Sequence, residues 1–521
     1  MKNTMLNIFR RFLFIVTLSM TMSSAYAQFE AKVYTFTGEG SNALWSNPDN
    51  WDGGYIPTTG DSLYSFVFIT TTYADIIMDE DVTIDRLISS RIGNNLALQE
   101  GKTLTVNDTI EWRSEGNITL EDGAQLVYGN SFPAIVQKRI KAYDADTHAW
   151  NLIASPIMED VVPSIENGFL TENENGYSLY AYNASSNQWV DFKNAPFTIQ
   201  YGSSYLYTNV LDTILQFNGT VNGSAEPIEV GLSYYSAHGD MAGCNFIGNP
   251  LPCNALVDRS YYILNEDSNS LMAIALSSHT PIKPCTGLIV NAKEANETVA
   301  FRHEMLEPSE QHGYIEITAA KSSAQDLVLD NAILSFNDGD DLGKIALFEG
   351  APQVFFTKEN KDLAILSIDS TNMQPLKFRV EENGTYTLHF ELKDLSLPYL
   401  HLIDNITGGN IDLLATHDYT FSANTNNYTS RFKLVFDPHY GIEEDGPSTG
   451  SETFAYYANG EIHLVMEAQD FSSLQVIDLT GRVIMKRDAT NRVSTSGIAP
   501  GVYILRLETK NGIRTQKLVI D

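Results

Sequence analysis

An internal repeat of about 22 residues limits what the start of this chain can fold into. The segment NLALQEGKTLTV (95–106) matches NITLEDGAQLVY (117–128), with asparagine, leucine and glycine at the same places, and IIMDEDVTI (76–84) fits the same pattern earlier. Periods near 20 residues with short strands and a glycine turn are typical of stacked rungs of a β-solenoid. We therefore expect solenoid-like rungs over residues 28–135. Consecutive hairpins of a β-sandwich are the alternative.

A second duplication lies in residues 136–305. Three pairs of segments match in the same order along the chain: WNLIASPI (150–157) with CNFIGNPL (244–251), YAYNASSN (180–187) with YILNEDSN (262–269), and SYLYTN (204–209) with GLIVNA (287–292). Each copy reads as a strand that ends in a proline turn, a hairpin with an Asn/Ser-rich turn, and a later apolar strand. We expect two related β units packed together.

The remainder of the chain is also rich in strand signals. Residues 315–438 contain alternating runs such as GTYTLHFEL (384–392), which favour a β-sandwich. Residues 439–453 are rich in Gly, Ser, Pro and acids and read as a linker. Residues 454–521 read as a small separate β domain. Helical periodicity is scarce after the N-terminus, so the sequence predicts a mainly β, multi-domain protein.

Residues 1–27 have the pattern of a secretory signal peptide. A positively charged start precedes an apolar run from Phe12 to Met22, and Ala25 and Ala27 supply the small-x-small cleavage pattern before Gln28. This predicts export through the Sec translocase. The apolar run is about half the ~20 residues that a membrane span needs, which disfavours an anchor and predicts a mature form without a transmembrane segment.

The net charge of −32 argues against nucleic-acid binding, which needs clusters of Lys and Arg. Solubility explains the acidity, and Ca²⁺ binding is the alternative. The candidate for Ca²⁺ is FNDGDDLGK (336–344), where Asp338, Asp340 and Asp341 could offer carboxylate oxygens. Their spacing does not fit an EF-hand, and an Asx-rich turn explains them equally well. We expect no other cofactor or metal.

The three cysteines leave two interpretations open. Export permits a disulfide, and Cys244 with Cys253 would close a short loop. Three buried thiols, with Cys285 as the third, are the alternative.

Catalytic motifs are missing from the sequence. HEMLE (303–307) lacks the second histidine of a zinc protease motif, and neither a GxSxG elbow nor a P-loop is present. A carboxylate pair for glycoside hydrolysis is defined by distance in space and not by sequence spacing. We therefore expect a non-catalytic protein, with a carbohydrate-active enzyme as the alternative.

Aromatic residues cluster in ALWSNPDNWDGGYIP (43–57). Trp45, Trp51 and Tyr55 lie among Asn, Asp, Gly and Pro. Exposed rings on a polar loop could stack on sugars. The other interpretation is that they cap the open end of the solenoid, because terminal repeats need caps.

The C-terminal region differs from the rest of the chain in charge and pattern. From Arg482 onward it holds eight Lys/Arg and three Asp/Glu. The motifs LQVIDLTGRVI, APGVYILRL and a terminal KLVI occur in that order, and Asn511-Gly512 between alternating apolar residues is a strong hairpin signal. We expect two hairpins in this segment.

These three motifs resemble the C-terminal sorting domain (type A-like) of type IX secretion substrates from Bacteroidetes. The resemblance implies an Ig-like β-sandwich that the outer-membrane translocon recognises and a sortase-like protease usually removes. It assigns recognition to eight residues: Asp478, Gly481, Arg482, Pro500, Gly501, Tyr503, Lys517 and Val519. The implied protein is secreted or held at the cell surface via the periplasm. We expect an adhesin-like binding role there, with a surface glycan or host ligand as the partner.

Overall fold

The computed structural model describes residues 31–438 and 454–520, apart from short stretches within them. Those stretches are 59, 61–62, 114, 144–149, 173–175, 304–311, 325–326, 349, 426–428, 430, 459, 465–470, 479–481, 489 and 510–511. The expected signal peptide, with Ala25, Ala27 and Gln28, lies outside the described residues. The expected linker and Gly481 lie outside them as well.

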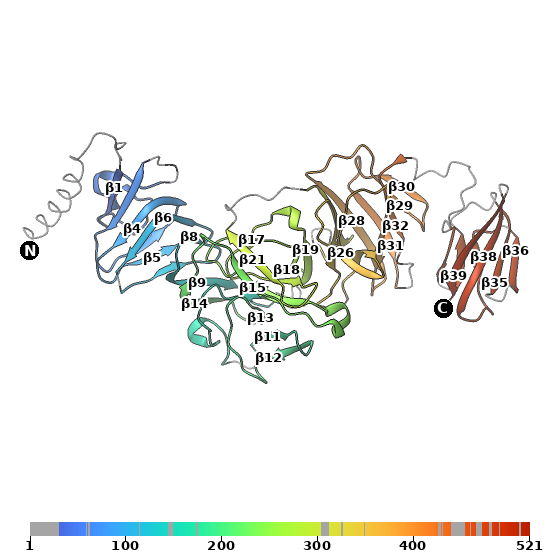
Figure 1. The fold of residues 1–521 in the computed structure, drawn as a ribbon, viewed down its shortest axis with the longest axis horizontal. Coiled ribbons are helices and arrows are strands. Elements are labelled where there is room, and N and C mark those ends of the chain that lie inside the picture. The colour runs from blue at the N-terminus through green and yellow to red at the C-terminus, as the bar shows by residue number, and fades with distance from the viewer. Residues whose placement is uncertain are drawn as a thin grey trace, which may run out of the picture. The chain divides into compact units, whose positions relative to one another are not determined.

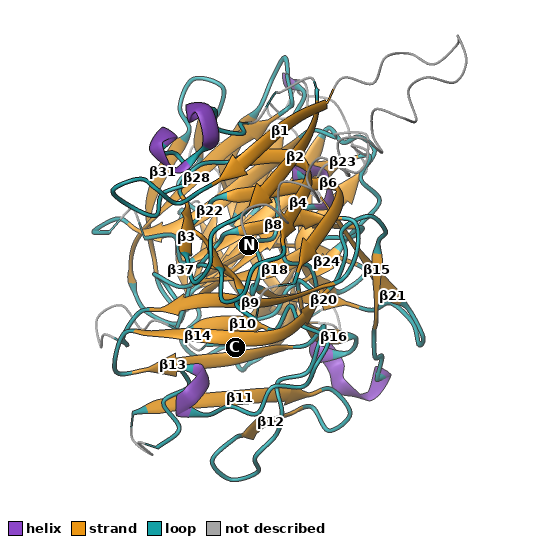
Figure 2. Cartoon of the chain, turned by 90° about the vertical axis from the view of Figure 1, so that its left-hand side faces the viewer, coloured by secondary structure: helices purple, strands orange, loops and turns teal. Residues whose placement is uncertain are grey.

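Strands dominate the fold, as Figures 1 and 2 show, and the prediction of a mainly β protein is confirmed. The helices of the described residues are short 3-10 turns: η2 (Pro48–Asn50), η3 (Asp52–Gly54), η4 (Ile165–Asn167), η5 (Ser236–Met241) and η6 (Leu276–Ser278). The chain divides into two compact units, residues 1–129 and 130–521.

Eight strands form the first unit, and they pair in parallel. They are β1 (Ala31–Phe36), β2 (Tyr64–Ile69), β3 (Asp75–Met78), β4 (Val82–Ser89), β5 (Asn95–Leu98), β6 (Thr103–Trp112), β7 (Ile118–Leu120) and β8 (Gln125–Tyr128). One sheet runs β1-β2-β4-β6-β8, and β3, β5 and β7 pair in that order in another. From β3 to β8 the chain alternates between the two sheets.

The strand register of this unit follows the sequence repeat. Val82 pairs with Leu104, which pairs with Leu126, and all three side chains are buried. Gly101 and Gly123 both have a φ of 71°, which a residue with a Cβ rarely adopts. The alternative of consecutive hairpins requires antiparallel neighbours, whereas the pairs between these eight described strands are parallel.

Two tryptophans pack inside the first unit. Trp45 and Trp51 are almost fully buried, with ring centroids 4.7 Å apart, and Phe36 packs against both. The Trp51 indole N–H donates to the Trp45 carbonyl at 2.7 Å. Of the two interpretations, burial rules out sugar stacking by these two rings. Tyr55 is different, since 69% of it is exposed.

The duplicated region folds as two copies of one β unit. The first copy consists of β9 (Phe132–Ile140), β10 (Asn151–Ala154), β11 (Tyr177–Asn183), β12 (Gln188–Asp191), β13 (Ser204–Asn209) and β14 (Thr213–Val221). The second consists of β15 (Ile228–Gly231), β16 (Cys244–Gly248), β17 (Ala255–Val257), β18 (Tyr261–Asn265), β19 (Ser270–Ile274), β20 (Gly287–Asn291) and β21 (Thr298–His303).

Both copies have the same strand order. One sheet runs β10-β13-β11-β12 and the other runs β16-β20-β18-β19, so equivalent strands occupy equivalent places. The first and last strands of each copy also pair, β9 with β14 and β15 with β21. The hairpin turns match in detail, because Asn187 and Asn269 have φ values of 53° and 51°. We call residues 132–221 repeat 1 and residues 228–303 repeat 2.

The two repeats contact each other reciprocally. Ile153 of repeat 1 forms an isolated β-bridge with Thr286 of repeat 2. The equivalent residues, Ile247 of repeat 2 and Ser203 of repeat 1, form a second β-bridge. The hydrogen bond from Ala154 N to the Cys285 carbonyl (3.1 Å) is repeated from Gly248 N to the Gly202 carbonyl (3.2 Å). Such exchange of equivalent contacts is characteristic of a two-fold arrangement. The repeats therefore meet as a pseudo-dimer within one chain.

Small residues make this junction possible. A Cβ on Gly248 would lie 2.0 Å from the Cβ of Ala154, its equivalent in the other repeat. A Cβ on Gly287 would lie 2.5 Å from that of Ser204, again its equivalent. The backbones thus approach each other too closely for side chains on both partners.

Gly248→Ala should destabilise the pair of repeats by about 1–3 kcal/mol, because overpacking forces the two backbones apart. Urea unfolding of the full chain measures this. Gly231→Ala is the matched control, since a Cβ there meets nothing within 4 Å. Equal stability of the Gly248 variant and the control would contradict the proposed junction.

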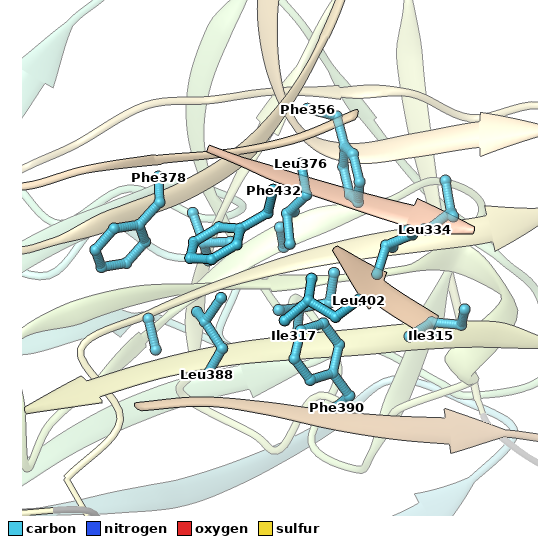
Figure 3. Close-up of a cluster of buried hydrophobic side chains, with 14 of the residues drawn as sticks. Ile315, Ile317, Leu334, Phe356, Leu376, Phe378, Leu388, Phe390, Leu402 and Phe432 are labelled. Atoms are coloured by element: carbon cyan, nitrogen blue, oxygen red, sulfur yellow. The ribbon is translucent and has the colours of Figure 1, made fainter. Parts of the chain in front are cut away.

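In the third region, residues 314–435, the strands form one continuous sheet, and strands from its different parts pack around a shared hydrophobic core. Its strands are β22 (Tyr314–Lys321), β23 (Asp330–Phe336), β24 (Leu342–Gly343), β25 (Gln353–Lys358), β26 (Lys361–Ile368), β27 (Met373–Arg379), β28 (Gly384–Lys393), β29 (His401–Asp404), β30 (Gly409–Asp412), β31 (Asp418–Ala423) and β32 (Phe432–Val435). Figure 3 shows Ile317 and Phe390 facing Leu376 and Phe432 across the core.

A buried ion pair lies beside this core. Arg431 donates to both carboxylate oxygens of Asp404, from Nε at 2.9 Å and from Nη2 at 2.6 Å, and Tyr419 donates to the same carboxylate at 2.8 Å. Burial alone would raise the pKa of Asp404, but the Arg431 hydrogen bonds and charge outweigh it and keep that pKa below its ordinary value.

The sign of the pH dependence follows from this lowered pKa. The Asp404 contribution to stability is fully present above the unfolded pKa of about 3.9 and is lost as the pH falls through the folded pKa. Asp404→Asn should lower the free energy of unfolding at pH 6 by about 3 kcal/mol, because it leaves the buried Arg431 charge without its ionic partner. The difference should shrink at pH 2–3, and an equal difference at both pH values in urea titrations would contradict the assignment.

Of the two interpretations of the cysteines, the structure has three buried thiols: no disulfide joins Cys244, Cys253 and Cys285, all of which lie in the described part of the chain. Cys244 begins β16, and an extended strand of this length carries the chain about 13 Å from its start. Cys253 lies beyond the far end, where its carbonyl accepts from the Asn249 amide at 2.9 Å. Burial also raises the pKa of Cys244 to about 12.

The native chain should therefore resist iodoacetamide at pH 8, because its thiols are buried and the Cys244 thiolate is scarce. In urea without reductant, mass spectrometry should find three carbamidomethyl groups per chain. A single group would instead reveal a disulfide.

Candidate functional site

A pocket of about 640 Å³ lies between the two repeats. Repeat 1 contributes the β11–β12 hairpin and the loop before β13, and repeat 2 contributes β15, the loop after it and β16. The lining residues are Ala181, Tyr182, Asn183, Ala184, Ser185, Val190, Phe197, Tyr201, Gly202, Ser203, Val230, Gly231, Ser233, Tyr235, Asn245, Phe246 and Ile247. The reciprocal contact of Ser203 with Ile247 closes its base.

Aromatic side chains form one rim of the pocket. Tyr182 and Phe246 line it with ring centroids 4.8 Å apart, and Trp189 packs on both, at 5.4 Å from Tyr182 and 4.9 Å from Phe246. Trp189 remains 38% exposed. We call these three residues the aromatic platform. Contacts among its rings fix their orientation in advance of any ligand.

The loop after β15 adds a further ring to the lining, Tyr235, which is 40% exposed. It contacts the ring of His238, whose Nε2 lies 3.3 Å from the Ser185 carbonyl. This contact ties the loop after β15 to the β11–β12 turn. At the base, Tyr201 hydrogen-bonds the side chain of Asn222, and burial raises the pKa of Tyr201 to about 12.

The chemistry of the lining is neutral. Its described residues are aromatic, aliphatic, amide, hydroxyl or glycine, and they include no carboxylate, imidazole, amine or thiol. Asn245 is held in place by hydrogen bonds with the backbone of Ser233 in both directions, each at 2.8 Å. This arrangement can stack on and hydrogen-bond a ligand, and its described side chains offer no general acid or base for proton transfer at neutral pH.

The three Ca²⁺ candidates are engaged with separate partners. Asp338 accepts from Ser277 and Ser335, Asp340 accepts from Ser260 and pairs with Lys293 at 3.0 Å, and Asp341 pairs with Lys358 at 2.7 Å. Lysines at two of the three carboxylates disfavour a bound cation. Among the described residues, no group of three or more His, Cys, Asp or Glu could hold a metal ion.

Sequence reasoning missed the pocket, although it found the repeats that build it. The Asn/Ser-rich turn after β11 could be recognised because the segment at 262–269 repeats it. The remaining walls of the pocket come from segments that lie far apart in the sequence. The signal that could have pointed to Trp189 is its position opposite Leu271 in the alignment, where an aromatic ring replaces an aliphatic side chain.

The C-terminal region forms a two-sheet β-sandwich. Its strands are β33 (Ala455–Ala458), β34 (Glu461–Leu464), β35 (Phe471–Asp478), β36 (Val483–Asp488), β37 (Arg492–Ser494), β38 (Gly501–Thr509) and β39 (Gly512–Ile520). The sheets run β33-β34-β37 and β36-β35-β38-β39, and a core with Leu474, Val476, Leu505 and Leu507 lies between them.

The residues expected to carry the sorting signal gather at one end of the larger sheet. Asp478 accepts from the backbone N–H (3.0 Å) and Nε (3.2 Å) of Arg482, and it pairs with Tyr503 across β35 and β38. The Tyr503 hydroxyl donates to the Ala499 carbonyl beside Pro500 at 2.7 Å. In the β38–β39 register, three further pairs complete the cluster: Gly501 with Ile520, Val502 with Val519, and Ile504 with Lys517.

Known families match two parts of the chain. Residues 35–280 match a family described as a domain of unknown function (DUF8693). Residues 458–521 match the secretion system C-terminal sorting domain. No curated protein matches the chain.

Within the described residues, no helix is long and apolar enough to cross a membrane. The family match covers the sandwich in which the expected sorting residues cluster, and this domain implies interaction with the type IX secretion machinery. The chain is therefore a cargo protein of the type IX secretion system, typical of Bacteroidetes, and is secreted or located at the cell surface.

Proposed function

We propose that this cargo is a non-catalytic, adhesin-like binding protein that recognises an uncharged surface or host glycan. The pocket between the repeats carries the proposal, because it combines aromatic rings, of which Tyr235 is exposed, with neutral hydrogen-bonding groups. Concave sites of this composition are typical of ligand pockets, in which apolar surface gives affinity and a few polar groups fix orientation.

The neutral lining favours binding over catalysis. A glycoside hydrolase needs two carboxyl groups about 5–10 Å apart that flank the scissile bond. The described residues that line the pocket include none. The alternative of a carbohydrate-active enzyme would therefore need a carboxylate pair elsewhere on the chain.

The export route supports a role outside the cell. We propose that the Sec translocase first delivers the chain to the periplasm, and that the outer-membrane translocon then recognises the Asp478–Arg482 end of the sandwich. A sortase-like protease would remove the sorting domain afterwards. Residues 28–453 would then remain for the binding role.

Deleting residues 454–521 should trap the protein in the periplasm, because the sorting domain is then absent. Cell fractionation and immunoblotting in a type IX-competent host measure this. Deleting residues 31–129 is the control, since it removes a compact unit and leaves the sorting domain intact. Surface delivery of the first variant would contradict the assigned role of the domain.

The full chain should bind immobilised neutral glycans without cleaving them. A glycan array reports binding, and a reducing-end assay on the same glycans reports hydrolysis. Retention with no new reducing ends is the expected result. New reducing ends would favour the enzyme alternative, and failure to bind any glycan would contradict the proposed function.

A further inference from the structure

The two repeats differ in how far the equivalent face of their sheets is buried. In repeat 2 this face carries Tyr262, Leu264, Leu271 and Ala273, all of which are buried. The third region covers it: the Tyr262 hydroxyl donates to the Gly343 carbonyl at 2.6 Å, and Asn331 exchanges two hydrogen bonds with the backbone of Ala273. The face of repeat 2 is thus used for packing within the chain.

The equivalent face of repeat 1 has a different composition and remains partly open. Tyr182 and Trp189 take the places of Leu264 and Leu271, and they pair across β11 and β12 as the leucines do across β18 and β19. The leucines are 9% and 7% exposed, whereas Trp189 is 38% exposed. The two leucines of repeat 2 are thus buried, whereas Trp189, at one of the two equivalent positions of repeat 1, remains partly exposed.

We infer that the aromatic platform is a stacking site for the pyranose ring of a neutral saccharide. This inference rests on the proposed function and assigns its ligand class and principal contact residue. Trp189 is 38% exposed, so part of its ring is open to solvent. Tyr182 and Phe246 contact that ring and also line the pocket, so the platform borders the pocket.

Charge favours neutral saccharides over acidic ones at this site. Asp191 lies two residues after Trp189 on the same face of β12, because side chains of a strand alternate between faces. The lining itself supplies no cation, and the chain carries a net charge of −32. An anionic sugar would therefore find repulsion and no counter-charge.

Trp189→Ala tests the inference in the full chain. The probes are maltohexaose, cellohexaose and lacto-N-tetraose as neutral saccharides, and sialyllactose and oligogalacturonate as acidic ones, each titrated by calorimetry. We expect at least one neutral probe to bind and the variant to weaken it by about tenfold or more. Tyr55→Ala, which removes an exposed ring in the first unit, should leave affinity unchanged.

Gly231→Phe is a second variant that acts through the pocket. Gly231 lines the pocket with open space at its Cβ, so the added ring should block the polar groups and also weaken binding about tenfold. Circular dichroism and urea unfolding confirm that both variants are folded.

The possible results distinguish failure of the proposed binding function from failure of the aromatic platform as its site. If no neutral or acidic saccharide binds the wild type, the proposed function fails together with the inference. If a neutral saccharide binds and Trp189→Ala and Gly231→Phe leave its affinity unchanged, the platform assignment is wrong although the binding role stands. Preferential binding of the acidic probes overturns the ligand class.

Discussion

The close backbone contact at the junction of the two repeats is the constraint on which the central region depends. Gly248 lies against Ala154, and equivalent residues exchange the same bridges and hydrogen bonds. Because the contact is reciprocal, any change in one repeat alters the fit of both. The pocket exists because this junction brings the β11–β12 hairpin of repeat 1 next to the edge strand β16 of repeat 2.

Duplication also gives the chain two copies of one sheet face with different side chains. Two copies of a β unit present the same sheet face twice. The third region packs on the face of repeat 2 and also on part of repeat 1, where Leu152 and Leu206 join the same core. Trp189 is not part of that core and remains 38% exposed. In the C-terminal sandwich, the residues of the sorting signal also shape the fold, since the Tyr503 hydroxyl and the Asp478 carboxylate both bind neighbouring backbone.

Local signals in the sequence predicted much of this architecture. The 22-residue offset between matching segments became the register of Leu104 with Leu126, and the shared Asn/Ser turns marked equivalent hairpins. The pocket could not be predicted, because its walls depend on long-range contacts such as Ser203 with Ile247. The exposure of aromatic side chains could not be predicted either, because the sequence alone does not distinguish a buried ring such as Trp45 from a partly exposed ring such as Trp189. The short spacing of Cys244 and Cys253 likewise allowed a disulfide, but the extended strand β16 that begins at Cys244 carries the chain away from it.

Hydrogen exchange of the full chain with and without a bound neutral saccharide tests whether the ligand is held between the two repeats. A ligand held between the repeats should slow exchange in two separate segments, residues 181–203 and 230–247, since both line the pocket. The saccharide should be recovered intact. Protection confined to residues 31–129, or cleavage of the saccharide during the experiment, would contradict a non-catalytic binding site between the repeats.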